Sequence, residues 1–184
     1  MIARVLRSLW RDTEGTALVE GSILLPVLMS LLFGVYEFSF FFYQQQLITT
    51  GVRDAARFLA RNDLSSCTTS PLTSGNCSVT VMLSGTATNV VTVAKNIAVS
   101  GFTGGTPARV TGWAASNVAI NLNSLANSGG STPCGVNACS GRSTIQVVVV
   151  STTFADPSLG LFGYLGLSAP NLVVSHAERV IGPG

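Results

Sequence analysis

The sequence predicts an α+β protein in which a long N-terminal helix, first membrane-spanning and then amphipathic, packs on a small antiparallel sheet. Three observations predict this class. Residues 21–43 form an apolar run that is long enough to cross a bilayer. Residues 44–62 continue it with apolar side chains at helical spacing. The second half of the chain contains three alternating or β-branched segments that are typical of strands.

The apolar run predicts a single membrane crossing. The 23 residues from Gly21 to Tyr43 would reach roughly 34 Å as a helix, against a hydrocarbon core of about 30 Å. No charged residue lies between Glu20 and Glu37. We therefore expect this segment to anchor the chain in the inner membrane.

The residues before the run predict its orientation. Arg4, Arg7 and Arg11 give the N-terminus a positive charge, which favours a cytoplasmic location for that end. Everything after the run should then lie in the periplasm or outside the cell.

A secretory signal would place its small-residue cleavage site after the apolar run, but here the junction of small residues, Gly15-Thr16, precedes it. Cleavage there would leave the apolar helix at the new N-terminus.

Glu20 lies at the start of the span. A carboxylate costs roughly 2.5 to 3.5 kcal/mol at the centre of a bilayer and less near the edge. Cleavage after Gly15 would create an ammonium on Thr16, about one helical turn from Glu20. That charge pair could set the register of packed helices. Alternatively, Glu20 only marks the start of the span among the headgroups.

Four other residues interrupt the apolar span, namely Pro26, Ser30, Gly34 and Glu37. Pro26 removes a backbone donor, which membrane helices tolerate when neighbours satisfy the freed carbonyl. Ser30 and Gly34 form a weak small-xxx-small pair. Glu37 lies either at the outer interface, within an aromatic belt, or inside the bilayer against a partner helix. The belt would consist of Tyr36, Phe38, Phe40, Phe41, Phe42 and Tyr43.

The stretch RDTEGTALVEGSILLPVLMSLLFGVYEF, followed by GVRDAARFLAR, resembles the TadE-like pseudopilins of Tad (Flp, tight adherence) pilus systems. The resemblance implies a pilin-like fold and a prepilin peptidase that cuts after Gly15. It also implies other pilin and pseudopilin subunits, the pilus assembly platform and the inner membrane as partners. The expected organisation is a leader at 1–15, a helix at 16–62 and an extracytoplasmic domain at 63–184.

Beyond the membrane, the helix is expected to be amphipathic. Its apolar residues follow helical spacing, so one side can cover a soluble domain. They are Leu47, Ile48, Val52, Ala55, Ala56 and Leu59. Gly51 lowers helix stability and is read as a flexible point. Arg53, Arg57 and Arg61 recur every four residues on one face, which is either solvated or meets an anionic membrane or an acidic partner.

Four cysteines follow the helix, at Cys67, Cys77, Cys134 and Cys139. An even count in polar segments outside the cytoplasm predicts disulfides. Pairing of nearest neighbours is the simplest of the three connectivities. Zinc is the alternative, but neither spacing is a close ligand pair and the single histidine, His176, is remote.

The middle of the chain is ambiguous. Residues 78–83 read as a short strand or part of a loop. Residues 88–100 contain β-branched residues that favour a strand, whereas AKNIAVS followed by Gly101 favours a helix. We expect a helix at about 90–99, which the similarity of AKNIAVSG to TadE-like proteins supports.

Three segments are expected to form the antiparallel sheet, at 117–122, 144–154 and 172–181, with the amphipathic helix covering one face. The last two are separated by a Leu-rich loop punctuated by glycines. Leu161, Phe162, Tyr164 and Leu165 form its apolar cluster. This loop either folds onto the core or is a patch that docks on another subunit or the membrane.

Composition limits the function. With 184 residues, 47% hydrophobic and 10% charged, the chain has room for one small domain and an anchor. A net charge of +2 gives no indication of a nucleic-acid partner. No nucleophile motif or phosphate loop occurs, which predicts neither an enzyme nor a cofactor or metal.

We therefore expect a minor pseudopilin that acts in pilus assembly or adherence. The alternative is an uncleaved, membrane-anchored periplasmic binding or adhesion module.

Overall fold

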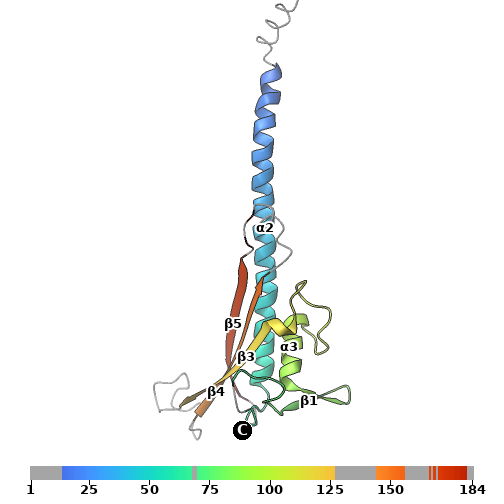
Figure 1. The fold of residues 1–184 in the computed structure, drawn as a ribbon, viewed down its shortest axis with the longest axis vertical. Coiled ribbons are helices and arrows are strands. Elements are labelled where there is room, and N and C mark those ends of the chain that lie inside the picture. The colour runs from blue at the N-terminus through green and yellow to red at the C-terminus, as the bar shows by residue number, and fades with distance from the viewer. Residues whose placement is uncertain are drawn as a thin grey trace, which may run out of the picture. The chain divides into compact units, whose positions relative to one another are not determined.

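The computed structural model describes residues 14–67, 70–126, 144–155, 166, 168 and 170–181. The fold is α+β, as the sequence predicts (Figure 1). The chain divides into two compact units between Phe41 and Phe42. In the first unit, the described residues form one helix. The second unit contains the rest of that helix, a shorter helix and two antiparallel sheets.

Helix α2 (Glu14–Ala60) has 47 residues and continues through Pro26. Its end is stabilised by bonds to its last carbonyls, which have no partner within a helix. The amide of Asn62 donates to the carbonyl of Leu59 at 3.0 Å, and its side-chain nitrogen donates to the carbonyl of Phe58 at 2.7 Å. The amide of Ile181 donates to the carbonyl of Ala60 at 2.7 Å, so the end of α2 is tied to the end of the chain's last strand.

Strands β1 (Thr80–Leu83) and β2 (Thr86–Asn89) form a hairpin. Ser84 and Gly85 both have positive φ angles, 47° and 84°, as a two-residue hairpin turn requires. The segment at 78–83, which sequence left open between strand and loop, therefore contains a strand. Its partner β2 was not expected.

Helix α3 (Val90–Ser100) follows β2 directly, where a helix was expected at 90–99. The Asn89 side chain accepts a hydrogen bond from the amide of Val91 at 2.9 Å and caps the helix. Gly101, with φ of 81°, ends it in the left-handed conformation. The strand reading holds only for Thr88 and Asn89 at the start of this stretch, because the β-branched residues from Val90 to Val93 are helical.

The second sheet contains β3 (Val118–Ala126), β4 (Thr144–Ala155) and β5 (Asn171–Arg179) in the order β3-β4-β5, all antiparallel. The short helix η1 (Ala115–Asn117) leads into β3. Strand β3 runs four residues beyond its expected end. Residues that share a face of the sheet lie in rows across its three strands. Ile120, Val150 and His176 form one such row.

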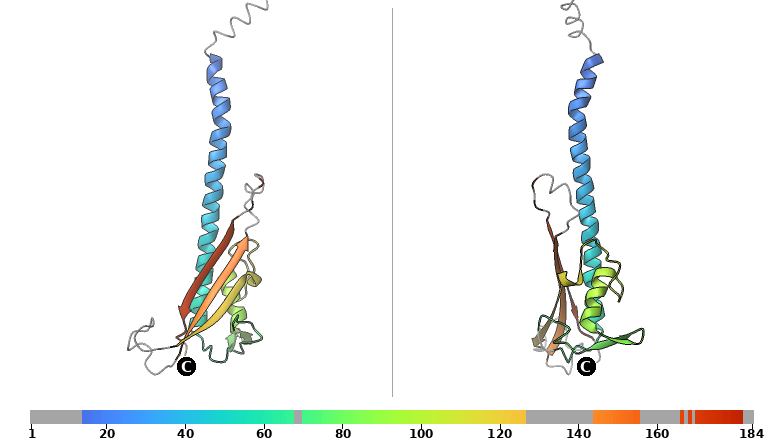
Figure 2. Two further views of the ribbon diagram at one scale, coloured as in Figure 1. Left: turned by 60° about the vertical axis from the view of Figure 1, so that its left-hand side comes forward. Right: turned by 45° about the vertical axis from the view of Figure 1, so that its right-hand side comes forward.

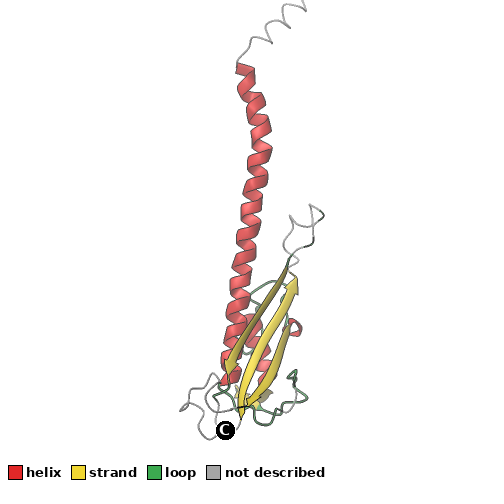
Figure 3. Cartoon of the chain, turned by 90° about the vertical axis from the view of Figure 1, so that its left-hand side faces the viewer, coloured by secondary structure: helices red, strands yellow, loops and turns green. Residues whose placement is uncertain are grey.

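The core of the second unit lies between that face and the two helices. Figures 2 and 3 show α3 and the C-terminal part of α2 on the same side of the sheet. Trp113 is buried there, and its indole nitrogen donates to the Thr152 hydroxyl at 3.1 Å. The α2 side chains that the spacing predicts to be buried are so, namely Ile48, Val52, Ala55, Ala56 and Leu59, with Leu47 half-buried.

Gly51 is not a flexible point, which corrects the expectation from sequence. A Cβ atom there would collide with the Ala98 carbonyl oxygen and would lie 3.0 Å from the Trp113 ring. Glycine is present because the backbones of α2 and α3 approach closely at this position.

Candidate membrane and assembly segment

The candidate cleavage junction lies at the start of α2. Gly15 and Thr16 follow Glu14 within the first helical turn. Glu20 lies on the same helix with an exposed side chain and makes no ion pair among the residues that the structure describes. The peptidase site and the register role of Glu20 stay predictions.

Helix α2 is long and apolar enough over Leu18–Ala60 to cross a membrane, with a mean hydropathy of 2.1 in its most apolar window. The side chains of that window are not buried by the rest of the chain. Leu18 is 78% exposed, Ile23 65% and Leu31 63%. Since burying each such side chain is worth about 1.5–3 kcal/mol, this surface strongly favours an apolar environment.

Serine hydroxyls in this segment bond to the helix itself. Ser22, Ser30 and Ser39 donate to carbonyls three or four residues earlier, at 2.8, 2.8 and 2.7 Å. This pairing satisfies hydroxyls that would otherwise be costly in an apolar environment. The Ser30 hydroxyl is thus used within its own helix, while a Cβ at Gly34 would have no neighbour within 4 Å. Ser30 and Gly34 therefore leave room for another helix to approach closely, but the Ser30 hydroxyl already donates within its own helix.

The aromatic residues at the end of the apolar run include one ordered pair. The rings of Tyr36 and Phe40 stack with centroids 6.5 Å apart. Glu37, between them in sequence, is half-buried. The interfacial and intramembrane readings of Glu37 both stay open.

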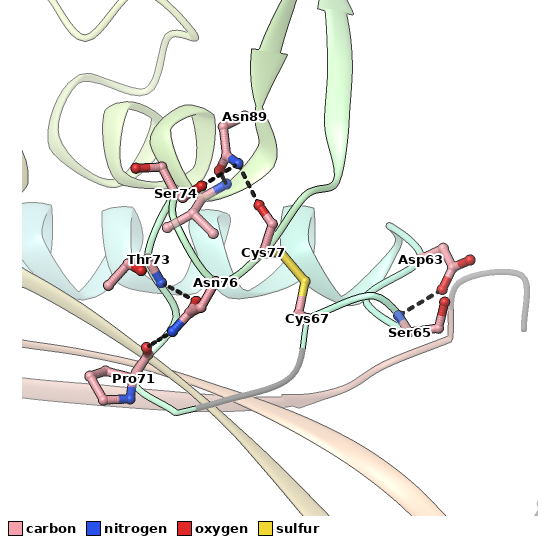
Figure 4. Close-up of a disulfide and its surroundings, with 10 residues drawn as sticks. Asp63, Ser65, Cys67, Pro71, Thr73, Ser74, Asn76, Cys77 and Asn89 are labelled. Carbon is pink, nitrogen blue, oxygen red and sulfur yellow. Dashed lines mark hydrogen bonds between the residues drawn. A yellow bond between two sulfur atoms is a disulfide. The ribbon is translucent and has the colours of Figure 1, made fainter.

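Past the helix, a disulfide joins Cys67 to Cys77, one of the nearest-neighbour pairs (Figure 4). In the chain-entropy account, closing so short a loop contributes about 2–3 kcal/mol. The Asn89 side chain, which caps α3, also donates to the carbonyl of Cys77 at 2.6 Å. The disulfide therefore connects the segment after α2 to the start of α3.

Asparagine and aspartate side chains order the rest of this loop (Figure 4). Asn76 accepts from the amide of Thr73 and donates to the carbonyl of Pro71, both at 2.8 Å. Asp63 accepts from the amide of Ser65 at 2.9 Å.

The other predicted pair, Cys134 and Cys139, lies outside the described residues. So do residues 1–13 of the leader and the candidate docking residues Leu161, Phe162, Tyr164 and Leu165.

Two ion pairs connect α2 to the rest of its unit. Asp54 accepts from Arg109 at 2.7 Å, and the Arg109 side chain is only 18% exposed. Arg57 lies 3.6 Å from Glu178, which also contacts His176 at 3.0 Å. The hydrogen bond from His176 lowers the pKa of the Glu178 carboxyl below its ordinary value of 4.5. Burial raises this pKa, while the positive charges of His176 and Arg57 lower it further.

Sequence reasoning missed both ion pairs, because their members are far apart in sequence. It placed His176 correctly on a strand, without a nucleophile beside it. Among the described residues, no three histidine, cysteine or acidic side chains gather as a metal site. The exposed side chains of α2 form an apolar surface that suits a membrane or partner helices. The same helix continues into the ordered second unit.

The comparisons with known proteins agree with this arrangement. Residues 15–57 match the family described as TadE-like protein. No curated protein and no solved structure matches the chain. The match begins at the candidate cleavage junction and covers the apolar segment together with Arg53 and Arg57. Residues 15–57 are thus similar to the TadE-like family, as the sequence motifs predict.

Proposed function

We propose that the chain is a minor pseudopilin of a Tad/Flp-type pilus that acts in pilus assembly or adherence. The observation that carries this proposal is the unburied apolar surface of α2, which follows Gly15 directly and lies within the segment matched to TadE-like proteins. Such a surface suits lateral packing in a bilayer and then against the helices of other pilin and pseudopilin subunits.

Processing is the second part of the proposal. A prepilin peptidase cuts the bond between Gly15 and Thr16, and the ammonium that forms on Thr16 pairs with Glu20 in the same or a neighbouring subunit. Thr16 and Glu20 lie in the first two turns of α2 and their side chains are exposed, which supports access from another chain.

The proposed topology has a cytoplasmic N-terminus, one span in the inner membrane and a domain in the periplasm or outside the cell. The leader occupies 1–15, the helix 16–62 and the domain 63–184. The disulfide between Cys67 and Cys77 supports this orientation, because disulfides persist in oxidising compartments. The pilus assembly platform would then receive the helix from within the membrane.

Mass spectrometry of the protein from cells with an active peptidase tests the proposal. We expect a mature chain that begins at Thr16 and a Gly15→Leu variant that retains Met1. Gly21→Leu, in the same helix but away from the junction, is the matched control and should be cut normally. A wild-type chain that keeps residues 1–15 would instead support the uncleaved, membrane-anchored binding or adhesion module.

A further inference from the structure

One face of α2 in the second unit presents positive charge that the domain does not neutralise. Arg53, Arg57 and Arg61 are exposed and lie four residues apart, so they line one side of the helix. Arg53 and Arg61 make no ion pair among the described residues. Arg57 has a carboxylate at 3.6 Å, but its side chain is still 57% exposed.

Two acids beside this face, Asp54 and Glu178, have other partners. Asp54 could pair with Arg57 three residues later on the helix. Its carboxylate is instead bonded at 2.7 Å to Arg109. Glu178 is shared between Arg57 and a closer contact with His176. Each of these two carboxylates therefore has a closer partner than the exposed arginines.

A groove lies along the same face. It encloses about 470 Å³ and is lined by Asp54, Arg57, Phe58, Arg61 and Asn62. Phe58 is half-buried and gives the groove an apolar wall, while the two arginines supply planar donors that suit carboxylates. This combination fits a protein segment that carries an acidic residue next to an apolar one.

In the proposed topology, the number of residues between the apolar run and the groove argues against lipid headgroups as the ligand. At 1.5 Å per residue, Arg53 is roughly 15 Å and Arg61 roughly 27 Å along the helix from Tyr43, where the apolar run ends. A headgroup layer is only about 5–8 Å thick on each side of the bilayer. Even with a helix tilt of about 40°, Arg61 stays outside that layer.

We propose that the groove, with Arg57 and Arg61, binds an acidic segment of another subunit of the pilus apparatus. A carboxylate of the partner bonds Arg61 and an apolar neighbour packs on Phe58. This inference rests on the proposed function, since it names the chemistry of the partner with which the pseudopilin assembles. The alternative role of the two arginines is to stabilise the C-terminal end of α2 through its dipole.

The experiment uses the full-length protein in its own cells, with the photocrosslinker benzoylphenylalanine in place of Asn62. We expect a crosslink to another pilus subunit, within a peptide that contains Asp or Glu. Arg61→Glu should reduce this crosslink at least tenfold. The matched control is Lys95→Glu, an identical charge change on α3, which should leave it unchanged. The same photocrosslinker in place of the exposed hairpin residue Met82 should give no such product.

Thermal unfolding of the detergent-purified protein separates docking from helix stabilisation. Arg61→Glu should lower the midpoint by no more than about 4 °C, the size of a dipole effect in a domain of this length. A crosslink that survives Arg61→Glu, that forms with lipid or that maps to a peptide without acids overturns the inference, as does the lack of any crosslink.

Deletion of the gene tests the proposed function separately. Loss of pili on deletion, combined with no crosslink from position 62, would overturn the groove and leave the pseudopilin assignment intact. Normal pili on deletion would overturn that assignment, and the partner identified by the crosslink would still decide the chemistry of the groove.

Discussion

The two parts of helix α2 share one backbone geometry but have opposite relations to their surroundings. Before Phe41, apolar side chains are exposed on all sides, as at Leu28, which is 62% exposed. After Phe42, most apolar side chains gather on one side and many of them are buried, as at Ile48 and Val52, which are both 0% exposed. The distribution of apolar residues around a helix, rather than its helicity, thus indicates whether lipid or protein covers it.

The largest difference between the two parts should come from their glycines. Gly51→Ala places a methyl group against the Ala98 carbonyl oxygen and should cost at least about 3 kcal/mol, because backbone must move. Gly34→Ala meets no atom within 4 Å and should stabilise the helix by about 0.5–1 kcal/mol. Denaturant unfolding of the full chain in detergent measures both. Equal effects would show that α3 does not pack on α2 at Gly51.

Truncation of apolar side chains should give a smaller contrast in the same direction. Ile48→Ala leaves a cavity in the core and should cost about 2.5 kcal/mol. Leu28→Ala removes a side chain that contacts little of its own chain and should change the free energy of unfolding by less than about 0.5 kcal/mol. The same unfolding assay applies. A large loss at Leu28 would mean that the first part of the helix is covered by protein in the purified state.

Charged groups within the second part should give a weaker contrast. Asp54→Asn removes the carboxylate from Arg109, whose side chain is only 18% exposed, and should cost about 1–2 kcal/mol. Arg53→Gln, next to it on the exposed face, is the control and should have an effect within about 0.5 kcal/mol. Thermal unfolding can compare them. If the two variants match, the pair of Asp54 and Arg109 contributes nothing to stability.

The smallest effect should be a pH dependence carried by Glu178. Because its pKa is lower in the folded protein than the ordinary 4.5, its ionised form stabilises the fold above that pH, and the contribution is lost as pH falls through the folded pKa. With the side chain a third exposed, the loss should stay below about 1 kcal/mol. Unfolding measured from pH 6 to pH 3 should show this loss in the wild type and not in Glu178→Gln.

Local sequence signals predicted much of the fold. The spacing of apolar residues predicted which side of α2 is buried, and Asn89 with Gly101 marks the two ends of α3. The two-residue turn at Ser84 and Gly85 could have revealed the β1–β2 hairpin, but residues 78–83 and 88–100 were read as two separate ambiguous segments and were not paired.

Contacts between distant residues could not be predicted in this way. Arg109 reaches Asp54 across 55 residues of sequence, and the need for glycine at position 51 arises only when α3 packs against it. The residues proposed for cleavage and register, Gly15 and Glu20, were found from a motif rather than from packing. Their roles depend on other chains, so neither sequence periodicity nor the fold of one chain can decide them.

The hydrogen bond between Ala60 and Ile181 has a mechanical consequence. In the proposed role, a pull on the N-terminal end of α2 would be transmitted along the helix to this bond and to the buried side chains beside it. Since Val180 also bonds Gln146 on β4, the force would be shared between two strands rather than borne by one loop. The domain would then resist extraction from its helix as a single cooperative body.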